Sequence, residues 1–180
     1  MADAIDTLLG RARGARFQNP AAAKQDVSQA VALARTAKDP LPLAQALTAL
    51  GQIERDLHRP DQALQHYEEA AEIYRATDAP LKLAHTVRHV GDIHRHEGRL
   101  KQAEACYQEA LAIYRAHPET PPLDLANALR GFASLKEAEG DAQTALQLWE
   151  EAGKLYASAN VEAGVAESEQ RMARLKTQSE

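Results

Sequence analysis

The 180-residue sequence is poor in cysteine and in aromatic residues. A single cysteine, Cys106, excludes an intrachain disulfide framework, and no Asn-x-Ser/Thr glycosylation site occurs. Aromatic residues make up 4% of the chain, although 44% of it is hydrophobic. The many alanines suit closely packed helices better than a large globular core. We therefore expect one elongated domain over residues 1–180.

The chain also lacks a long apolar run and an excess of basic charge. Its first residues are acidic rather than basic, so neither a secretory signal nor a membrane anchor is indicated. The formal net charge is −5, from 26 acidic and 21 basic residues. This balance argues against binding of nucleic acid or an anionic membrane through bulk electrostatics. We expect a cytoplasmic protein whose partner is neither nucleic acid nor membrane.

Motifs for catalysis are missing as well. The sequence contains no phosphate loop, nucleophile elbow, dinucleotide fingerprint or paired cysteine ligands. The two Gly-Asp pairs begin at Gly91 and Gly140 and fit helix and turn positions. We expect no enzymatic activity and no cofactor.

What the sequence does contain is a repeat. Residues 40–76, 80–116 and 122–158 align as three copies of one helix-turn-helix unit. Apolar residues recur at helical intervals, and a proline opens each copy, where it costs no hydrogen bond and stops the preceding helix. The columns predict two helices in each copy, which we name A and B. Matched columns include Pro40, Pro80 and Pro122; Leu47, Val87 and Leu129; Gly51, Gly91 and Ala133; Tyr67, Tyr107 and Trp149; and Tyr74, Tyr114 and Tyr156.

Weaker copies flank these three. Stepping back by 40 residues predicts a degenerate first hairpin over 3–36, with an A helix near 3–17 and a B helix over 21–36. Beyond the last copy, an apolar stripe in an otherwise polar stretch predicts a capping helix over 161–176. Glycine in two of the three A-to-B turns, at Gly98 and Gly140, suits a left-handed helix ending.

The order of large apolar, small, and later Ala, aromatic and Ala positions resembles the tetratricopeptide repeat. The period of 40 to 42 residues is similar to that of the kinesin light chain type. The resemblance implies an all-α fold, a right-handed α-solenoid of about four antiparallel helix hairpins plus a C-terminal capping helix. One column departs from the family, because its usual aromatic is replaced by Glu54, His94 and Lys136.

In that family a partner peptide lies in a concave groove formed by the A helices, so the resemblance implies a non-enzymatic protein interaction module. Arg88 aligns with Arg130, and Arg55 with Arg95, which predicts a positive stripe suited to an acidic segment or a C-terminal carboxylate. Alternatively, these arginines are solvated or paired within the chain. The positions that correspond to the groove are Gln45, Thr48, Gln52, Arg55, His85, Arg88, His89, Asp92, Arg95, His96, Asn127, Arg130, Ser134 and Glu137.

Two other functions stay open. An apolar end or face, for instance around the degenerate first hairpin, would let copies dock into a self-associating oligomeric scaffold. His85 and His89 are spaced i, i+4, with His94 and His96 a turn later, which is a spacing that can chelate a metal or make the groove charge pH-dependent. However, no His-Glu-x-x-His motif completes a metal site.

Cys106 and the tyrosine column are expected to serve packing. Free cysteine usually behaves as a small apolar residue, so we expect Cys106 to pack rather than react. Tyr74, Tyr114 and Tyr156 are predicted to fill interfaces between helices, with their hydroxyls reaching solvent.

Overall fold

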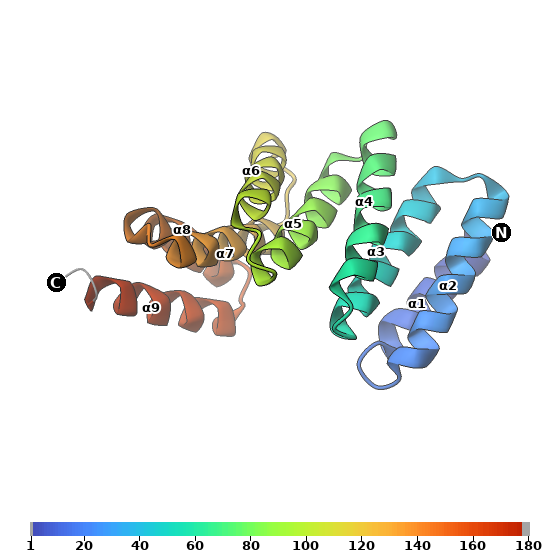
Figure 1. Cartoon of the computed structure of the whole chain (residues 1–180), viewed down its shortest axis with the longest axis horizontal. Helices are drawn as coiled ribbons and strands as arrows, with labels where there is room; N and C mark the ends of the chain where they lie inside the picture. The colour runs from blue at the N-terminus through green and yellow to red at the C-terminus, as the bar shows by residue number, and fades with distance from the viewer. Residues whose placement is uncertain (1, 178–180) are drawn as a thin grey trace. The chain divides into compact units, whose positions relative to one another are not determined.

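The structure is a computed structural model that describes residues 2–177. These residues form helices only, and Figure 1 shows successive helices turning back on one another as hairpins. The predicted all-α class, built of helix hairpins, is confirmed. The helices are α1 (Ala2–Ala15), α2 (Pro20–Ala37), α3 (Pro40–Asp56), α4 (Pro60–Ala76), α5 (Pro80–His96), α6 (Leu100–Ala116), α7 (Pro122–Glu139), α8 (Ala142–Ser158) and α9 (Glu162–Thr177). None of them combines the length and the apolar character needed to cross a membrane.

Proline opens the helices that the repeat columns predict as A helices. α3, α5 and α7 begin at Pro40, Pro80 and Pro122. The backbone N–H of the first helical residue has no acceptor within the helix, so proline loses nothing there, and its fixed φ already suits the helix. Helix starts in this chain are therefore encoded locally.

Several helices end at a residue in the left-handed conformation, although α6 ends with His117 in an extended one. Gly98 and Gly140 have φ of 72° and 80°, as predicted for glycine endings. His58 holds the corresponding turn between α3 and α4 with φ of 57°, although it carries a Cβ. The turn geometry thus recurs without glycine, at a steric cost of about 1–2 kcal/mol for each such residue. Lys38, Asp78 and Asn160 end their helices in the same way.

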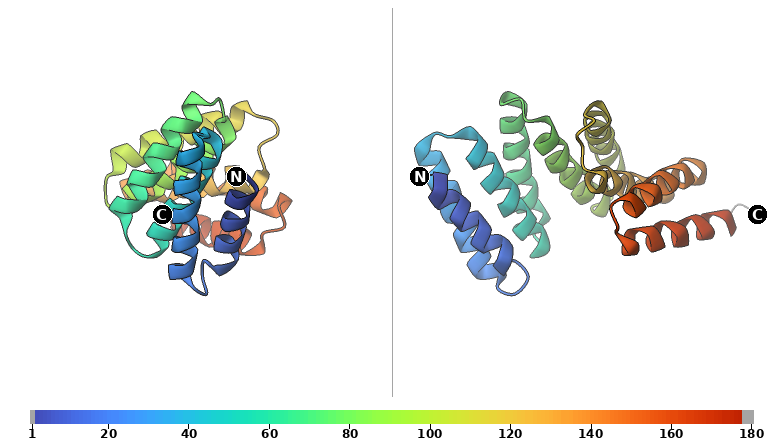
Figure 2. Two further views of the ribbon diagram at one scale, coloured as in Figure 1. Left: turned by 90° about the vertical axis from the view of Figure 1, so that its right-hand side faces the viewer. Right: turned by 180° about the vertical axis from the view of Figure 1, so that it is seen from behind.

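Packing divides the chain into two compact units, Met1–Thr86 (unit 1) and Val87–Glu180 (unit 2). The division falls within α5, so the first half of this helix belongs to unit 1 and the second half to unit 2. In unit 1, α1 packs on α2, α2 on α3, and α3 on α4; in unit 2, α6 packs on α7, α7 on α8, and α8 on α9. Figure 2 shows α8 and α9 side by side at the red end of the chain. The single-domain organisation stays a prediction.

Aromatic rings of the B helices pack against glycines of the A helices in both units. Tyr67 and Tyr107 are fully buried. A Cβ atom at Gly51 would lie 2.9 Å from the Tyr67 ring in unit 1, and one at Gly131 would lie 2.6 Å from the Tyr107 ring in unit 2. Both distances are shorter than a normal carbon contact, so any side chain at these glycines would push the ring away. The close approach of paired helices depends on these small residues.

Paired polar groups fill the column in which the family aromatic is missing. Glu54 of α3 is 2% exposed, and its carboxylate lies 2.7 Å from Lys24 Nζ of α2. Lys136 of α7 donates to Glu104 of α6 at 2.5 Å. Burial would lower the pKa of Lys136, but hydrogen bonds and charges of neighbouring carboxylates raise it above its ordinary value. Ion pairs to the preceding B helix therefore replace aromatic packing at this position.

Candidate partner-binding face

The predicted groove residues lie on the A helices α3, α5 and α7. The first five of them, from Gln45 to His85, belong to unit 1, and the nine from Arg88 to Glu137 belong to unit 2, so each set is described by itself. Thr48, Arg88 and His89 are buried, whereas His96 and Arg130 are exposed; the remaining positions are half-buried.

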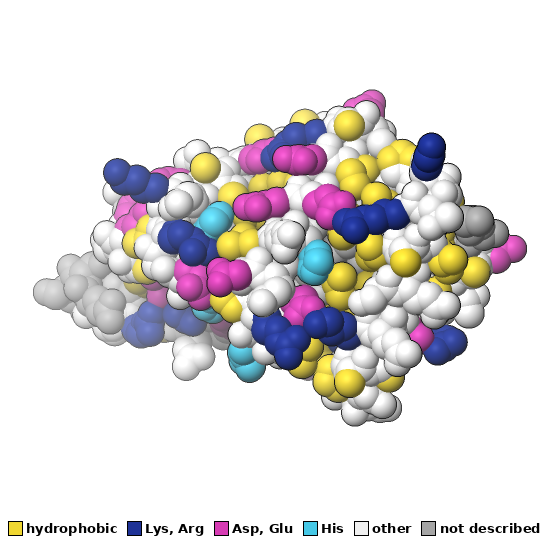
Figure 3. All heavy atoms as spheres, turned by 45° about the vertical axis from the view of Figure 1, so that its right-hand side comes forward, with side chains coloured by type: hydrophobic (Ala, Val, Ile, Leu, Met, Phe, Trp, Pro, Cys, Tyr) yellow, Lys and Arg dark blue, Asp and Glu magenta, His cyan; other side chains and the backbone are white. Residues whose placement is uncertain are grey.

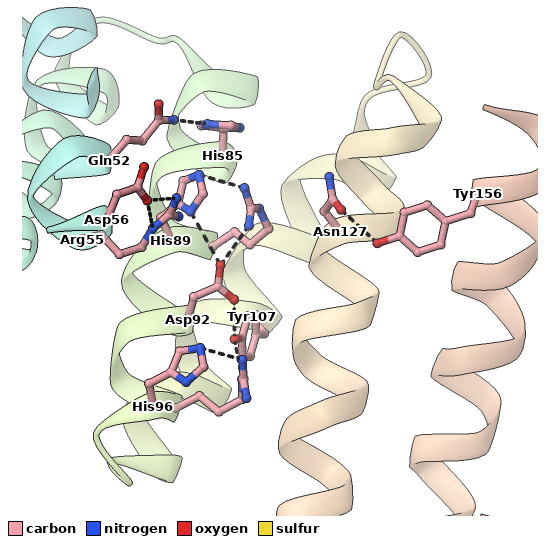
Figure 4. Close-up of polar contacts among 12 residues, drawn as sticks. Gln52, Arg55, Asp56, His85, His89, Asp92, His96, Tyr107, Asn127 and Tyr156 are labelled. Atoms are coloured by element: carbon pink, nitrogen blue, oxygen red, sulfur yellow. Dashed lines mark hydrogen bonds and ion pairs between the residues drawn. The ribbon is translucent and has the colours of Figure 1, made fainter. Parts of the chain in front are cut away.

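In unit 1 the polar groups of α3 bond to one another and to the turn after α1. Arg16 donates to Gln52 Oε1 at 3.0 Å and to Asp56 Oδ2 at 2.6 Å. Gln52 Nε2 lies 3.3 Å from His85 Nε2, as Figure 4 shows. Arg55 pairs with Asp56 at 3.1 Å. Burial would raise the pKa of Asp56, but the hydrogen bonds and charges of Arg16 and Arg55 hold it below its ordinary value. The carboxylate of Asp56 thus neutralises part of the positive charge on this face within unit 1.

In unit 2 the carboxylate of Asp92 is the centre of a polar network (Figure 4). It accepts hydrogen bonds from Arg88 Nη1 at 2.9 Å and from the Tyr107 hydroxyl at 2.8 Å. Arg88 Nη2 lies 2.8 Å from His89 Nε2, and His89 Nδ1 lies 3.6 Å from Asp92 Oδ2. Burial would raise the pKa of Asp92, but His89, Arg88 and Tyr107 together hold it well below its ordinary value. Asp92 is therefore a fixed anion on this face.

Tyr107 belongs to the B helix α6 and was not among the predicted site residues. Its ring lies between two glycines, since a Cβ would come within 3.2 Å of it at Gly91 and within 2.6 Å at Gly131. This passage lets the hydroxyl donate to Asp92 and accept from Arg95 Nε at 3.3 Å. Burial, and then the charge of Asp92, raise the pKa of Tyr107 well above its ordinary value. The repeat columns gave no signal for this passage, because Gly91 aligns with Ala133 and not with Gly131.

Two aromatic residues of α8 hold the polar residues of α7 in the same way. Trp149 Nε1 donates to Glu137 Oε1 at 2.5 Å. The Tyr156 hydroxyl donates to Asn127 Oδ1 at 2.9 Å, as Figure 4 shows. Because its oxygen is the acceptor, the Asn127 amide nitrogen is left without a partner among residues 2–177. Arg171 and Arg174 of α9 also donate to Glu137, and the Arg171 guanidinium lies 5.7 Å from the centre of the Trp149 ring; these contacts join α7, α8 and α9.

The prediction that the hydroxyls of the tyrosine column reach solvent is wrong. The Tyr156 hydroxyl bonds Asn127, and the Tyr114 hydroxyl is buried without a hydrogen-bond partner within the described residues. Burial raises the pKa of Tyr114 above its ordinary value. The rings are long enough to cross from the B helix to the polar face of the A helices, so their hydroxyls end there rather than in water.

Three of the four aligned arginines are paired with carboxylates of the same chain, whereas Arg95 contacts the Tyr107 hydroxyl and His96. Arg88 pairs with Asp92, Arg55 with Asp56, and Arg130 Nη1 lies 3.2 Å from Glu167 of α9. On the face shown in Figure 3, acidic and basic side chains lie intermixed. The predicted positive stripe is therefore partly neutralised within each unit. Arg88 Nε nevertheless stays buried and without a hydrogen-bond partner in the described part of the chain.

The histidines do not form a metal cluster in the part of the chain that the structure describes. No group of three or more His, Cys, Asp and Glu side chains within 2–177 is placed to hold a metal ion. His89 takes part in the Asp92 network, and His94 Nδ1 accepts from Arg99 Nε at 2.9 Å. Cys106 packs against α5, where a Cβ at Gly91 would lie 3.1 Å from its own Cβ.

Comparisons with known proteins agree with this architecture. No curated protein matches the sequence. The fold is shared by "BtubC (BKLC)" from P. vanneervenii, with 17% sequence identity over 97% of this chain and 89% of that chain and a TM-score of 0.60. Aspartyl phosphate phosphatase F from Bacillus subtilis is 14% identical over 95% of this chain and 45% of that chain, with a TM-score of 0.83. A signal transduction ATPase with numerous domains and a tetratricopeptide repeat sensor, from Pyrococcus horikoshii, is 17% identical over 93% of this chain and 26% of that chain, with a TM-score of 0.80. This chain spans less than half the length of the last two.

Family membership follows from the repeats themselves. Residues 43–77 and 82–158 match the tetratricopeptide repeat family. These segments contain the A and B helices whose columns carry the resemblance. Tetratricopeptide repeats are protein interaction modules, and this chain belongs to the tetratricopeptide repeat family.

Proposed function

We propose that the chain binds an acidic, extended segment of a partner protein on one polar face of unit 2. This polar face consists of Arg88, Asp92 and Arg95 on α5 and of Asn127 and Arg130 on α7. The proposal makes no use of catalysis or of a bound metal.

One observation carries the proposal: aromatic side chains of the B helices fix polar side chains of the A helices. Tyr107 holds Asp92, and Tyr156 holds Asn127, each through a hydrogen bond shorter than 3.0 Å. A side chain that is already held loses less conformational entropy when a ligand binds. The rings thus prepare this face for a partner.

Hydrogen-bond donors outnumber acceptors among the groups that remain. The Asn127 amide nitrogen has no partner among residues 2–177, whereas Asp92 already accepts from Arg88 and Tyr107. Arg130 is 49% exposed, and its partly exposed ion pair with Glu167 is worth about 1 kcal/mol or less. Free donors favour carboxylates and backbone carbonyls, so an acidic segment is the ligand class that fits.

The test is a display selection of random peptides against the whole chain, followed by affinity measurements on the enriched peptides. Enriched peptides should be acidic, and Arg130→Glu should weaken their binding about tenfold or more, because a charge-assisted contact becomes repulsive. Lys154→Glu is the matched control, since Lys154 lies on α8, is 73% exposed, and undergoes the same charge reversal.

A second variant tests whether the hydrogen bond from Tyr107 to Asp92 contributes to peptide binding. Tyr107→Phe removes only the hydroxyl that holds Asp92 and should weaken peptide binding while the helix content at room temperature is retained. The proposal fails if no peptide is enriched, or if the enriched peptides bind the Arg130 variant as tightly as the unaltered chain.

A further inference from the structure

Phe17, in the turn between α1 and α2, is the most exposed large apolar side chain within residues 2–177. Its exposed fraction is 83%, against 40% for Leu123 and 37% for Leu41. Phenylalanine has a large apolar area, and its exposure to water carries a free-energy cost that association would remove. An aromatic side chain in such a position is typical of an anchor that another surface covers.

The Phe17 ring contacts a cation that is itself held by hydrogen bonds. The Arg16 guanidinium lies 5.1 Å from the ring centre, and Arg16 is itself fixed by hydrogen bonds to Asp56 and Gln52 of α3. Arg13, in the last turn of α1, forms no ion pair with a residue of 2–177. The surface around Phe17 thus combines an exposed apolar knob with an unneutralised cation.

A cleft with an apolar lining and acidic side chains lies between the end of α8 and the start of α9 in unit 2. Its volume is about 450 Å³, whereas a cavity of roughly 150 Å³ already holds a benzene ring. Glu162 and Glu169 at its rim form no ion pair with any residue that the structure describes. The apolar part of its lining comes from Ala157, Val161, Val165 and Ala166.

We propose that Phe17 of one copy inserts into the α8–α9 cleft of a second copy. The ring would cover the apolar lining, and Arg13 would approach the unpaired carboxylates of Glu162 and Glu169. Each copy carries one knob and one cleft, so the contact is heterologous: two different surfaces meet. This inference is independent of the proposed function, since neither surface includes the polar face of unit 2.

Light scattering coupled to chromatography, run on the full chain from micromolar to millimolar concentration, tests the proposal. The average mass should rise with concentration. Phe17→Ser and Ala166→Lys should each abolish self-association over this concentration range, the first by removing the knob and the second by placing a long cation in the cleft. Both positions are exposed, so the thermal melts should stay close to that of the unaltered chain. Leu123→Ser removes another exposed apolar side chain and serves as the matched control.

Mixing the two variants gives the decisive result. The Phe17 variant retains an intact cleft and the Ala166 variant an intact knob, so an equimolar mixture should form a one-to-one dimer, although each variant alone stays monomeric. A monomeric wild-type chain over the whole range, self-association that survives in either variant, or a mixture that stays monomeric would each overturn the proposal.

Discussion

Units 1 and 2 place opposite charges at one repeat position. In unit 1 the buried carboxylate of Glu54 faces Lys24, and in unit 2 the ammonium of Lys136 faces Glu104. Lys24 and Glu104 are each the fifth residue of the preceding B helix. The position therefore requires a matched pair between neighbouring helices and tolerates either polarity.

This comparison shows how a repeat can still select its neighbouring helix after the aromatic side chain at this position is lost. An ion pair with a buried member adds little net stability, because desolvation offsets the attraction, but reversing the buried member places it, unpaired, beside a like charge. A like-charged helix beside this position therefore destabilises the packing more than an oppositely charged helix stabilises it. Apolar packing at the same position would not distinguish neighbours in this way.

The largest expected effect on stability comes from reversing the charge of Glu54 in unit 1. Glu54→Lys should lower the free energy of unfolding by about 3–5 kcal/mol, because the new ammonium would lie beside Lys24 and Arg59 with its own position almost fully buried. Lys136→Glu should cost less, because the Lys136 side chain is 13% exposed against 3% for Glu54. Urea denaturation measures both.

Reversing both charges is the control for this prediction. Adding Lys24→Glu to the Glu54 variant should recover part of the loss, with Arg59 still facing the new cation, and adding Glu104→Lys should do so for the Lys136 variant. Independent effects in the double variants would show that the pairs do not act as pairs.

A smaller effect concerns the carboxylates of the two polar faces, Asp92 and Asp56. The pKa of each is lowered by folding, so each stabilises the chain above its unfolded pKa of about 3.9, and this contribution is lost as pH falls below that value toward the folded pKa. Asp92→Asn should cost about 1–3 kcal/mol at neutral pH and flatten the acid side of the stability curve.

Asp56→Asn should flatten the curve less. Asp56 is the more exposed of the two side chains, at 26% against 19%, and no tyrosine bonds it in the described structure. Urea titrations repeated from neutral to acidic pH compare the two variants. Equal slopes would contradict the difference between the units.

The smallest effect should be equal in the two units. Arg35 pairs with Glu69 across the B helices of unit 1 at 2.8 Å, and Arg115 pairs with Glu151 across those of unit 2 at 2.7 Å. All four side chains are more than a third exposed, so double-mutant cycles should give coupling energies of about 0.2–1 kcal/mol for each pair. A coupling above this range in one unit alone would show that its B helices are held differently.

The helices could be predicted from the sequence because the residues that start a helix and mark its buried face lie within the helix itself. Pro40, Pro80 and Pro122 mark helix starts through their own backbone chemistry, and apolar spacing marks the buried faces. The departing column was recognised, but the partners of Glu54 and Lys136 lie on other helices and become evident only in the structure.

The polar network was harder to predict because it depends on the position of one ring. The sequence places Tyr107 in a repeat column of aromatic residues, and nothing in that column shows that Gly91 and Gly131 leave a passage to Asp92. The same reasoning placed the Tyr156 hydroxyl in water, although it bonds Asn127. Composition identifies which residues are polar, but only packing decides which of them meet.

The surroundings of Trp149 make the end of unit 2 visible in solution. It is the sole tryptophan of the chain, it is fully buried, and its contacts with Glu137 and Arg171 tie it to α7 and α9. Its emission spectrum therefore reports the undocking of these helices, whereas circular dichroism reports helix content along the whole chain. Coincident thermal transitions in the two signals would mean that both units melt as one cooperative block, and an earlier fluorescence transition would mean that this end opens first.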